Sequence, residues 1–142
     1  MRSIVIVALQ ISLIAAIMLP FDARGWTPPA GALVLAGIAM GAWALTANRL
    51  GNFNIRPEVK PGGRLVTAGP YTYVRHPMYL AVMLAMPGFC LYHGTPWRWT
   101  VLAALGVVLV VKMGMEERAM AVRHPDYAGY ARTTKRIVPF VW

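Results

Sequence analysis

Four apolar runs without a single charged residue constrain this chain more than any other feature. They cover residues 3–19, 30–47, 78–92 and 99–111. A helix needs roughly 17–25 residues to span a bilayer; the first two runs reach this length, and the last two reach it with their flanking residues. Only 13% of the 142 residues are charged, whereas a soluble domain typically carries about 25%. The sequence therefore predicts one all-α integral membrane domain over residues 1–142, with four transmembrane helices at about 3–20, 30–47, 77–93 and 98–118.

The positive charge is concentrated in two polar segments. The formal net charge is +9, and most Lys and Arg residues fall within residues 48–77 or after residue 111. Lys and Arg accumulate on the cytoplasmic side of membrane proteins, so we expect both termini and the loop 48–77 in the cytoplasm. His93 and Arg98 would then lie in a short outer turn. Residues 3–19 could instead be a cleaved signal sequence, but no small-x-small cleavage pattern follows them, and we expect a retained first helix.

The stretch from residue 65 to residue 79 carries most of the chemistry that the sequence offers. It combines a Gly69-Pro70 turn with three tyrosines, the cation Arg75 and the imidazole of His76. Pro77 opens the third apolar run, where a helix tolerates proline because that N–H would be unpaired anyway. This stretch predicts a binding site at the cytoplasmic edge of the membrane. Taken singly, His76 could instead cap the helix, and Arg75 could pair with lipid phosphate.

Other motifs point to packing and to a polar tail. Gly37 and Gly41 form a GxxxG pair, which indicates close packing of the second helix against a neighbour. Glu116 and Glu117 follow the fourth apolar run, on the face where the central stretch is expected. A short tail helix is expected at about 125–136. We expect no metal site and no nucleic-acid partner.

Several motifs, in this order, resemble the isoprenylcysteine carboxyl methyltransferase family and the related phospholipid methyltransferases. They are Leu65-Val-Thr-x-Gly-Pro-Tyr71, Arg75-His-Pro-x-Tyr79, Glu116-Glu117, and Tyr127-x-x-Tyr130 followed by Val138-Pro139. The resemblance covers roughly residues 48–142. It implies S-adenosylmethionine as the cofactor. The cofactor-binding residues that it implies are Gly63, Arg64, Leu65, Val66, Tyr71, His76, Pro77, Met78, Tyr79 and Glu116.

The resemblance also implies a substrate-binding role for Lys112, one helical turn before Glu116. Lys112 stands where the carboxyl methyltransferases have arginine, and the spacing from the acidic pair to Tyr127 is one residue shorter than usual. His124-Pro125 replaces an aromatic residue and a glycine. A lipid or lipidated small molecule dissolved in the bilayer is the implied acceptor, with membrane lipids as the surroundings.

Elementary chemistry leaves the acceptor open. A carboxylate, with a pKa near 4, is already ionised and needs no base, whereas an ammonium near 10 must first lose a proton. No base is evident beyond His76, which favours an acidic or thiol acceptor over a phospholipid amine. The alternatives are a phospholipid N-methyltransferase and, from another class, a non-enzymatic four-helix scaffold or transport subunit.

Overall fold

A computed structural model describes residues 2–20, 26–48, 52 and 62–139. Within this part of the chain the fold is all-α, as predicted. Its elements are α1 (Arg2–Met18), α2 (Pro28–Asn48), the 3₁₀ turn η2 (Gly69–Thr72), α3 (Pro77–His93), α4 (Trp97–Arg123) and α5 (Tyr127–Thr133). The helices lie where the sequence predicted them, with two differences. α4 continues to Arg123, beyond the predicted end near residue 118, and the tail helix is shorter than expected.

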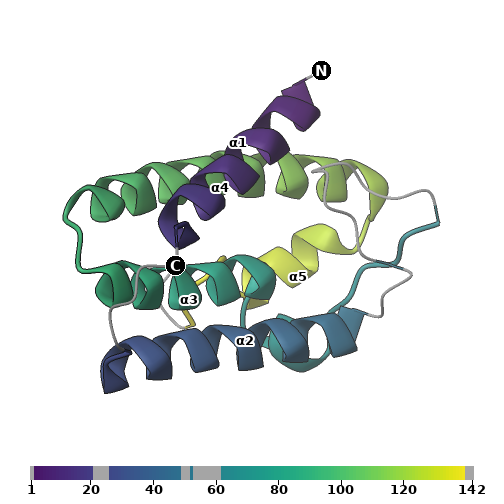
Figure 1. Cartoon of the computed structure of the whole chain (residues 1–142). Helices are drawn as coiled ribbons and strands as arrows, with labels where there is room; N and C mark the ends of the chain where they lie inside the picture. The colour runs from purple at the N-terminus through teal and green to yellow at the C-terminus, as the bar shows by residue number, and fades with distance from the viewer. Residues whose placement is uncertain (1, 21–25, 49–51, 53–61, 140–142) are drawn as a thin grey trace.

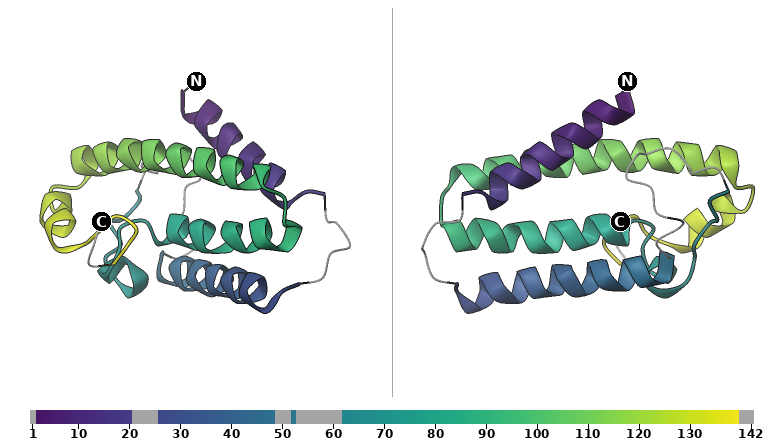
Figure 2. Two further views of the ribbon diagram at one scale, coloured as in Figure 1. Left: turned by 90° about the vertical axis from the view of Figure 1, so that its left-hand side faces the viewer. Right: turned by 45° about the vertical axis from the view of Figure 1, so that its right-hand side comes forward.

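Three helices lie side by side in the order α2, α3, α4, and α1 crosses α4 and α3 obliquely (Figures 1 and 2). α2 and α4 are long and apolar enough to cross a membrane, while α1 and α3 are shorter apolar helices. Large apolar side chains remain exposed on the outer faces, including Leu35 at 67% and Val107 at 65%. Such faces suit a hydrocarbon environment. The four-span arrangement itself stays a prediction.

Small residues set the contact between α2 and α3, which is the most extensive in the molecule. A Cβ placed on Gly37 would lie 2.7 Å from the Ala81 carbonyl oxygen, and one on Gly88 would lie 2.7 Å from the Ala30 carbonyl oxygen. Gly41 is one turn further along α2, and a Cβ placed on it would lie 3.6 Å from the Cβ atom of Ala81. The packing role predicted for the GxxxG pair is therefore confirmed.

Only the second half of α1 belongs to the core. Ile17 is fully buried, and Leu13, Ile14 and Met18 pack against the same core cluster as residues of α3 and α4. Residues near the start of the helix, such as Val5 at 64% exposed, cover little. Figure 1 shows this first half projecting beyond the other helices. α1 is thus anchored mainly at its C-terminal end.

Two residues at the connection between α3 and α4, where the short outer turn was expected, cap that end of α1. Arg98 is 2% exposed and donates to the carbonyl oxygens of Ala16, at 3.1 Å, and Ile17. The Nε2 atom of the buried His93 lies 3.1 Å from the Met18 carbonyl oxygen. The last carbonyls of a helix have no partner within it and carry partial negative charge. Burying a cation here is therefore compensated by these acceptors.

Candidate functional site

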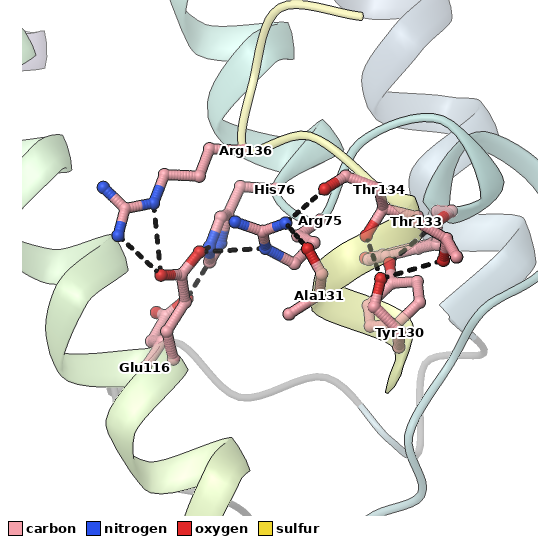
Figure 3. A network of polar contacts seen from close by, with 10 residues as sticks. Arg75, His76, Glu116, Tyr130, Ala131, Thr133, Thr134 and Arg136 are labelled. Carbon is pink, nitrogen blue, oxygen red and sulfur yellow. Dashed lines mark hydrogen bonds and ion pairs between the residues drawn. The ribbon is translucent and has the colours of Figure 1, made fainter. Parts of the chain in front are cut away.

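Polar side chains gather where the head of α3, the C-terminal part of α4 and the segment after α5 meet (Figure 3). Six of them form what we call the polar cluster: Arg75, His76, Tyr79, Glu116, Glu117 and Arg136. Local sequence explains the position of the first three. Pro77 occupies the first turn of α3 with His76 as the N-cap, so Arg75 and His76 precede the helix and Tyr79 begins its inward face.

Glu117 is the centre of this cluster. Its Oε1 atom accepts a hydrogen bond from Arg75 Nε at 3.0 Å and lies 3.3 Å from His76 Nε2. Its Oε2 atom accepts from both Arg136 Nε, at 3.2 Å, and Arg136 Nη2, at 2.9 Å. The carboxylate is only 14% exposed. Three basic groups therefore surround one acid, and both of its oxygens are engaged.

Glu116 is the more open acid of the pair. One oxygen accepts a hydrogen bond from the Tyr79 hydroxyl, and the other lies 3.6 Å from His76 Nδ1. The His76 and Tyr79 rings stack, with centroids 5.4 Å apart and planes inclined by 13°. The Glu116 side chain is 23% exposed. His76 thus lies between two carboxylates, one of which keeps an accessible edge.

The segment after α5 covers one side of the cluster. It runs alongside Val74, and its carbonyls accept from the amides of Arg75, at 2.7 Å, and His76, at 3.0 Å. The Arg75 guanidinium also donates to the carbonyls of Ala131, at 2.9 Å, and Thr134. The backbone just before α3 is therefore held by the protein's own tail.

The surroundings raise the pKa values of His76 and Tyr71. Burial alone would lower the pKa of His76, but hydrogen bonds and charge from Glu116 and Glu117 raise it above its ordinary value of 6.5. Burial, with the charge of Glu116, raises the pKa of Tyr71 to about 12. The imidazole is therefore held towards its cationic form, and the phenol towards its neutral form.

Lys112 lies in the fourth helix, as predicted, and its side chain is buried among the helices. It lies within α4, is 3% exposed, and its Nζ atom donates to Gln10 Oε1 of α1 at 2.9 Å. The same ammonium lies 5.3 Å from the centroid of the Tyr79 ring. Lys112 is thus a buried ionisable group of the helical bundle, although none of the four apolar runs contains a charged residue.

The structure brings together part of the predicted site. His76, Tyr79 and Glu116 are in mutual contact, Pro77 is buried beside them, and Met78 is half-buried in the same turn. Tyr71 is close enough to Glu116 to sense its charge, and its carbonyl accepts from the Tyr130 hydroxyl at 2.7 Å.

The loop residues of the predicted site lie apart from these. Residues 63–66 lie before η2 in a segment without regular secondary structure. The hydrogen bonds described for this segment join the Arg64 backbone to the Asn52 side chain, at 2.8 and 3.0 Å. Within the described part of the chain, none joins residues 63–66 to the polar cluster. Their role in binding stays a prediction.

Sequence reasoning missed the central position of Glu117 and the whole contribution of Arg136. The resemblance assigned a role to Glu116 alone, and the tail offered several equivalent basic residues. One signal was available: Arg136 lies two residues before Val138-Pro139, which belongs to the family pattern. His124, in a second Arg-His-Pro sequence, occupies the C-cap position of α4. No group of three metal-ligating side chains occurs among the described residues.

An apolar cavity of about 350 Å³ lies on the α2 side of the head of α3. Met40, Trp43, Pro70, Tyr73, Val74, Leu80 and Pro139 line it. No residue of α4 is among these lining residues, so this cavity lies between α2 and α3 rather than between α3 and α4.

Comparison with known proteins gives two findings. A model of the isoprenylcysteine carboxyl methyltransferase family matches residues 30–122, which is more than half of the chain. The cobalt-zinc-cadmium resistance protein CzcN of Cupriavidus metallidurans is 34% identical over 76 residues. That alignment covers 53% of this chain but only 35% of CzcN, so the similarity is confined to about a third of that protein.

Proposed function

The chain belongs to the isoprenylcysteine carboxyl methyltransferase family, and from this premise we propose that it transfers a methyl group from S-adenosylmethionine to an acceptor dissolved in the membrane. The observation that supports this most is the polar cluster at the head of α3, inside the segment that the family shares. We further propose that the chain crosses the membrane four times, with both termini in the cytoplasm. The cofactor would then reach the cluster from the side on which the basic residues gather.

The residues of the cluster fit the cofactor. Glu117 is neutralised by three basic groups, whereas Glu116 retains an accessible edge that can accept from an ammonium or from ribose hydroxyls. The faces of Tyr71 and Tyr79 suit a purine and a sulfonium cation. When bound, S-adenosylmethionine would supply an electrophilic methyl group. The protein's task is then to align the two partners and exclude water.

A carboxylate is the acceptor that these residues favour. His76 contacts two acids that raise its pKa, which makes it a poor proton acceptor near neutral pH. An ammonium acceptor would need such a base, and a carboxylate would not. The buried ammonium of Lys112, next to the Tyr79 ring, is suited to hold an anionic acceptor. An isoprenylcysteine-like acid fits better than a phospholipid amine.

The proposal is tested by calorimetry on protein purified in detergent. We expect S-adenosylmethionine or its demethylated product to bind with a Kd between about 1 μM and 1 mM. Glu116→Ala and His76→Ala should each weaken binding by about 1–3 kcal/mol, because each removes a hydrogen-bonding group with charge. His124→Ala, the matched control on the other Arg-His-Pro sequence, should leave the Kd within about twofold. Absence of binding to the wild-type protein in both detergent and nanodiscs would remove the basis for the proposal.

The second candidate is a non-enzymatic membrane scaffold or transport subunit. The observation that favours it is Lys112, since ionisable groups buried among membrane helices often mark transport pathways. The same calorimetry separates the two classes. A scaffold would bind no S-adenosylmethionine, and substitution of Glu116 would change its stability alone.

A further inference from the structure

The ammonium of Lys112 is incompletely satisfied for a group buried so deeply. It has three N–H donors and is 3% exposed. Among the described residues, its one hydrogen bond goes to the neutral amide oxygen of Gln10, at 2.9 Å. Glu116, one turn further along α4, is directed instead at Tyr79 and His76. A buried cation is normally compensated by an anion, and here no carboxylate forms an ion pair with it within the described part of the chain.

We infer that Gln10 holds the place of the acceptor's anionic group, and that the acceptor displaces it to reach Lys112. The inference rests on the proposed function and adds a residue of α1, which precedes the segment, residues 30–122, that the family model matches. The amide oxygen satisfies the ammonium while no acceptor is bound. A carboxylate in the same place adds the attraction of an ion pair to the hydrogen bond, because both partners then carry charge.

The position of α1 makes this exchange feasible. α1 contacts both α4 and α3, so it covers the seam between them in which Lys112 and the Tyr79 ring meet. Its C-terminal end is held by Arg98 and His93, whereas the half that precedes Gln10 buries little. Displacing Gln10 therefore disturbs few contacts. A lipidic acid arriving between α1 and the α3–α4 seam would place its charged end at Lys112, beside a residue of the proposed cofactor site.

The test compares two opposite substitutions at Gln10, using binding rather than turnover. The probes are a farnesyl thioether carrying one carboxylate and its uncharged methyl ester, titrated onto the full chain in detergent. Gln10→Glu places a fixed anion on Lys112 and should weaken binding of the acid probe at least tenfold. Gln10→Leu removes the competing oxygen and should strengthen it about threefold or more. The ester should bind all forms within about twofold.

Controls separate this inference from loss of fold and from the proposed function. Ser12→Ala, on the same helix and exposed, should change neither affinity. Lys112→Met should abolish the preference for acid over ester. Binding of S-adenosylhomocysteine should be the same in both Gln10 variants and in wild type.

Three results would overturn the inference. In the first, both Gln10 variants shift the acid probe in the same direction, as a purely structural role predicts. In the second, acid and ester shift together. In the third, wild type binds the cofactor product but not the acid probe. Failure to bind the cofactor product, with the opposite shifts at Gln10 intact, would instead count against methyl transfer and leave the anion site standing.

Discussion

Glu117 accepts hydrogen bonds from basic side chains that come from two distant parts of the chain. Arg75 precedes α3, and Arg136 follows α5. Glu117→Gln removes the charge while keeping the size, so it leaves these cations uncompensated in a site that is mostly buried. We expect a loss of about 1.5–3 kcal/mol of folding free energy, measured by thermal or denaturant unfolding in detergent.

Arg118→Gln is the matched control for that substitution. Arg118 is the next residue of α4 and is exposed, so its replacement should change stability by no more than about 0.5 kcal/mol. Equal effects at the two positions would show that the contacts of Glu117 contribute nothing particular to the fold.

The pH dependence of stability should reveal His76. Its folded pKa is raised above 6.5, so its charged contacts with Glu116 and Glu117 stabilise the protein fully below about pH 6.5. That contribution is lost as pH rises through the folded pKa. The difference in Tm between wild type and His76→Gln should therefore be largest near about pH 6 and decrease towards about pH 9. A difference that grows with pH would contradict this assignment; His124→Gln provides the comparison.

Individual residues show how much of the candidate site could be predicted from the sequence. His76, Tyr79 and Glu116 were predicted to lie together because the motif order placed them at one membrane edge, and they do. Lys112 was predicted to lie in the fourth helix, and it does. Its burial could not be predicted, because the fourth apolar run ends at residue 111 and charge alone does not show where a helix stops being buried. The long Lys112 side chain reaches a polar partner, Gln10, in a helix 102 residues earlier in the sequence.

At the scale of elements, the α2–α3 pair depends on glycine. A Cβ at Gly37 would meet the Ala81 carbonyl oxygen at 2.7 Å, and backbone cannot yield as a flexible side chain can. Gly37→Ala should therefore destabilise the protein by about 1–3 kcal/mol through overpacking. Gly31→Ala tests the same helix at a position with nothing within 4 Å. It should be neutral or stabilising by up to about 1 kcal/mol, since alanine is the better helix former.

Unfolding measurements on the two alanine variants would check this contrast. Similar stabilities for both would mean that α2 can move away from α3 at little cost. The sequence predicted that these glycines pack but could not name the partner, because small residues are common on all of the apolar runs. The end of α4 was also beyond it, since an apolar run shows where lipid contact ends rather than where helical hydrogen bonds end.

At the scale of the whole molecule, we predict that the tail, η2 and the head of α3 share the cytoplasmic side. In a Cys90→Ala background, single cysteines at the exposed positions Thr72 and Arg132 should react with a membrane-impermeant reagent only after the membrane is opened. A cysteine at the exposed Gly94 should react from outside. External labelling at Thr72 would reverse the topology and place the polar cluster on the wrong side for a cytoplasmic cofactor.

The pairing of the tail with the head of α3 is the part of the molecule that sequence could not provide. Two amides and a guanidinium of Arg75 and His76 bind carbonyls about sixty residues later in the chain. All of the acceptors are backbone carbonyls, so the tail's side chains carry no pattern that would reveal the pairing. They also explain why the last residues of the described chain belong to the site rather than to a solvated end.

Because α1 is anchored mainly at its C-terminal end, it can tilt about that end. Arg98 and His93 hold its C-terminal end. A helix of 17 residues extends about 25 Å from that end, at 1.5 Å per residue. A tilt of roughly 10° would move Gln10, near the middle of α1, by about 2 Å and the N-terminal end of the helix by about 4 Å. A displacement of about 2 Å is enough to break a hydrogen bond. A small rotation of α1 about its C-terminal end would therefore separate Gln10 from Lys112 while the other helices stay in place.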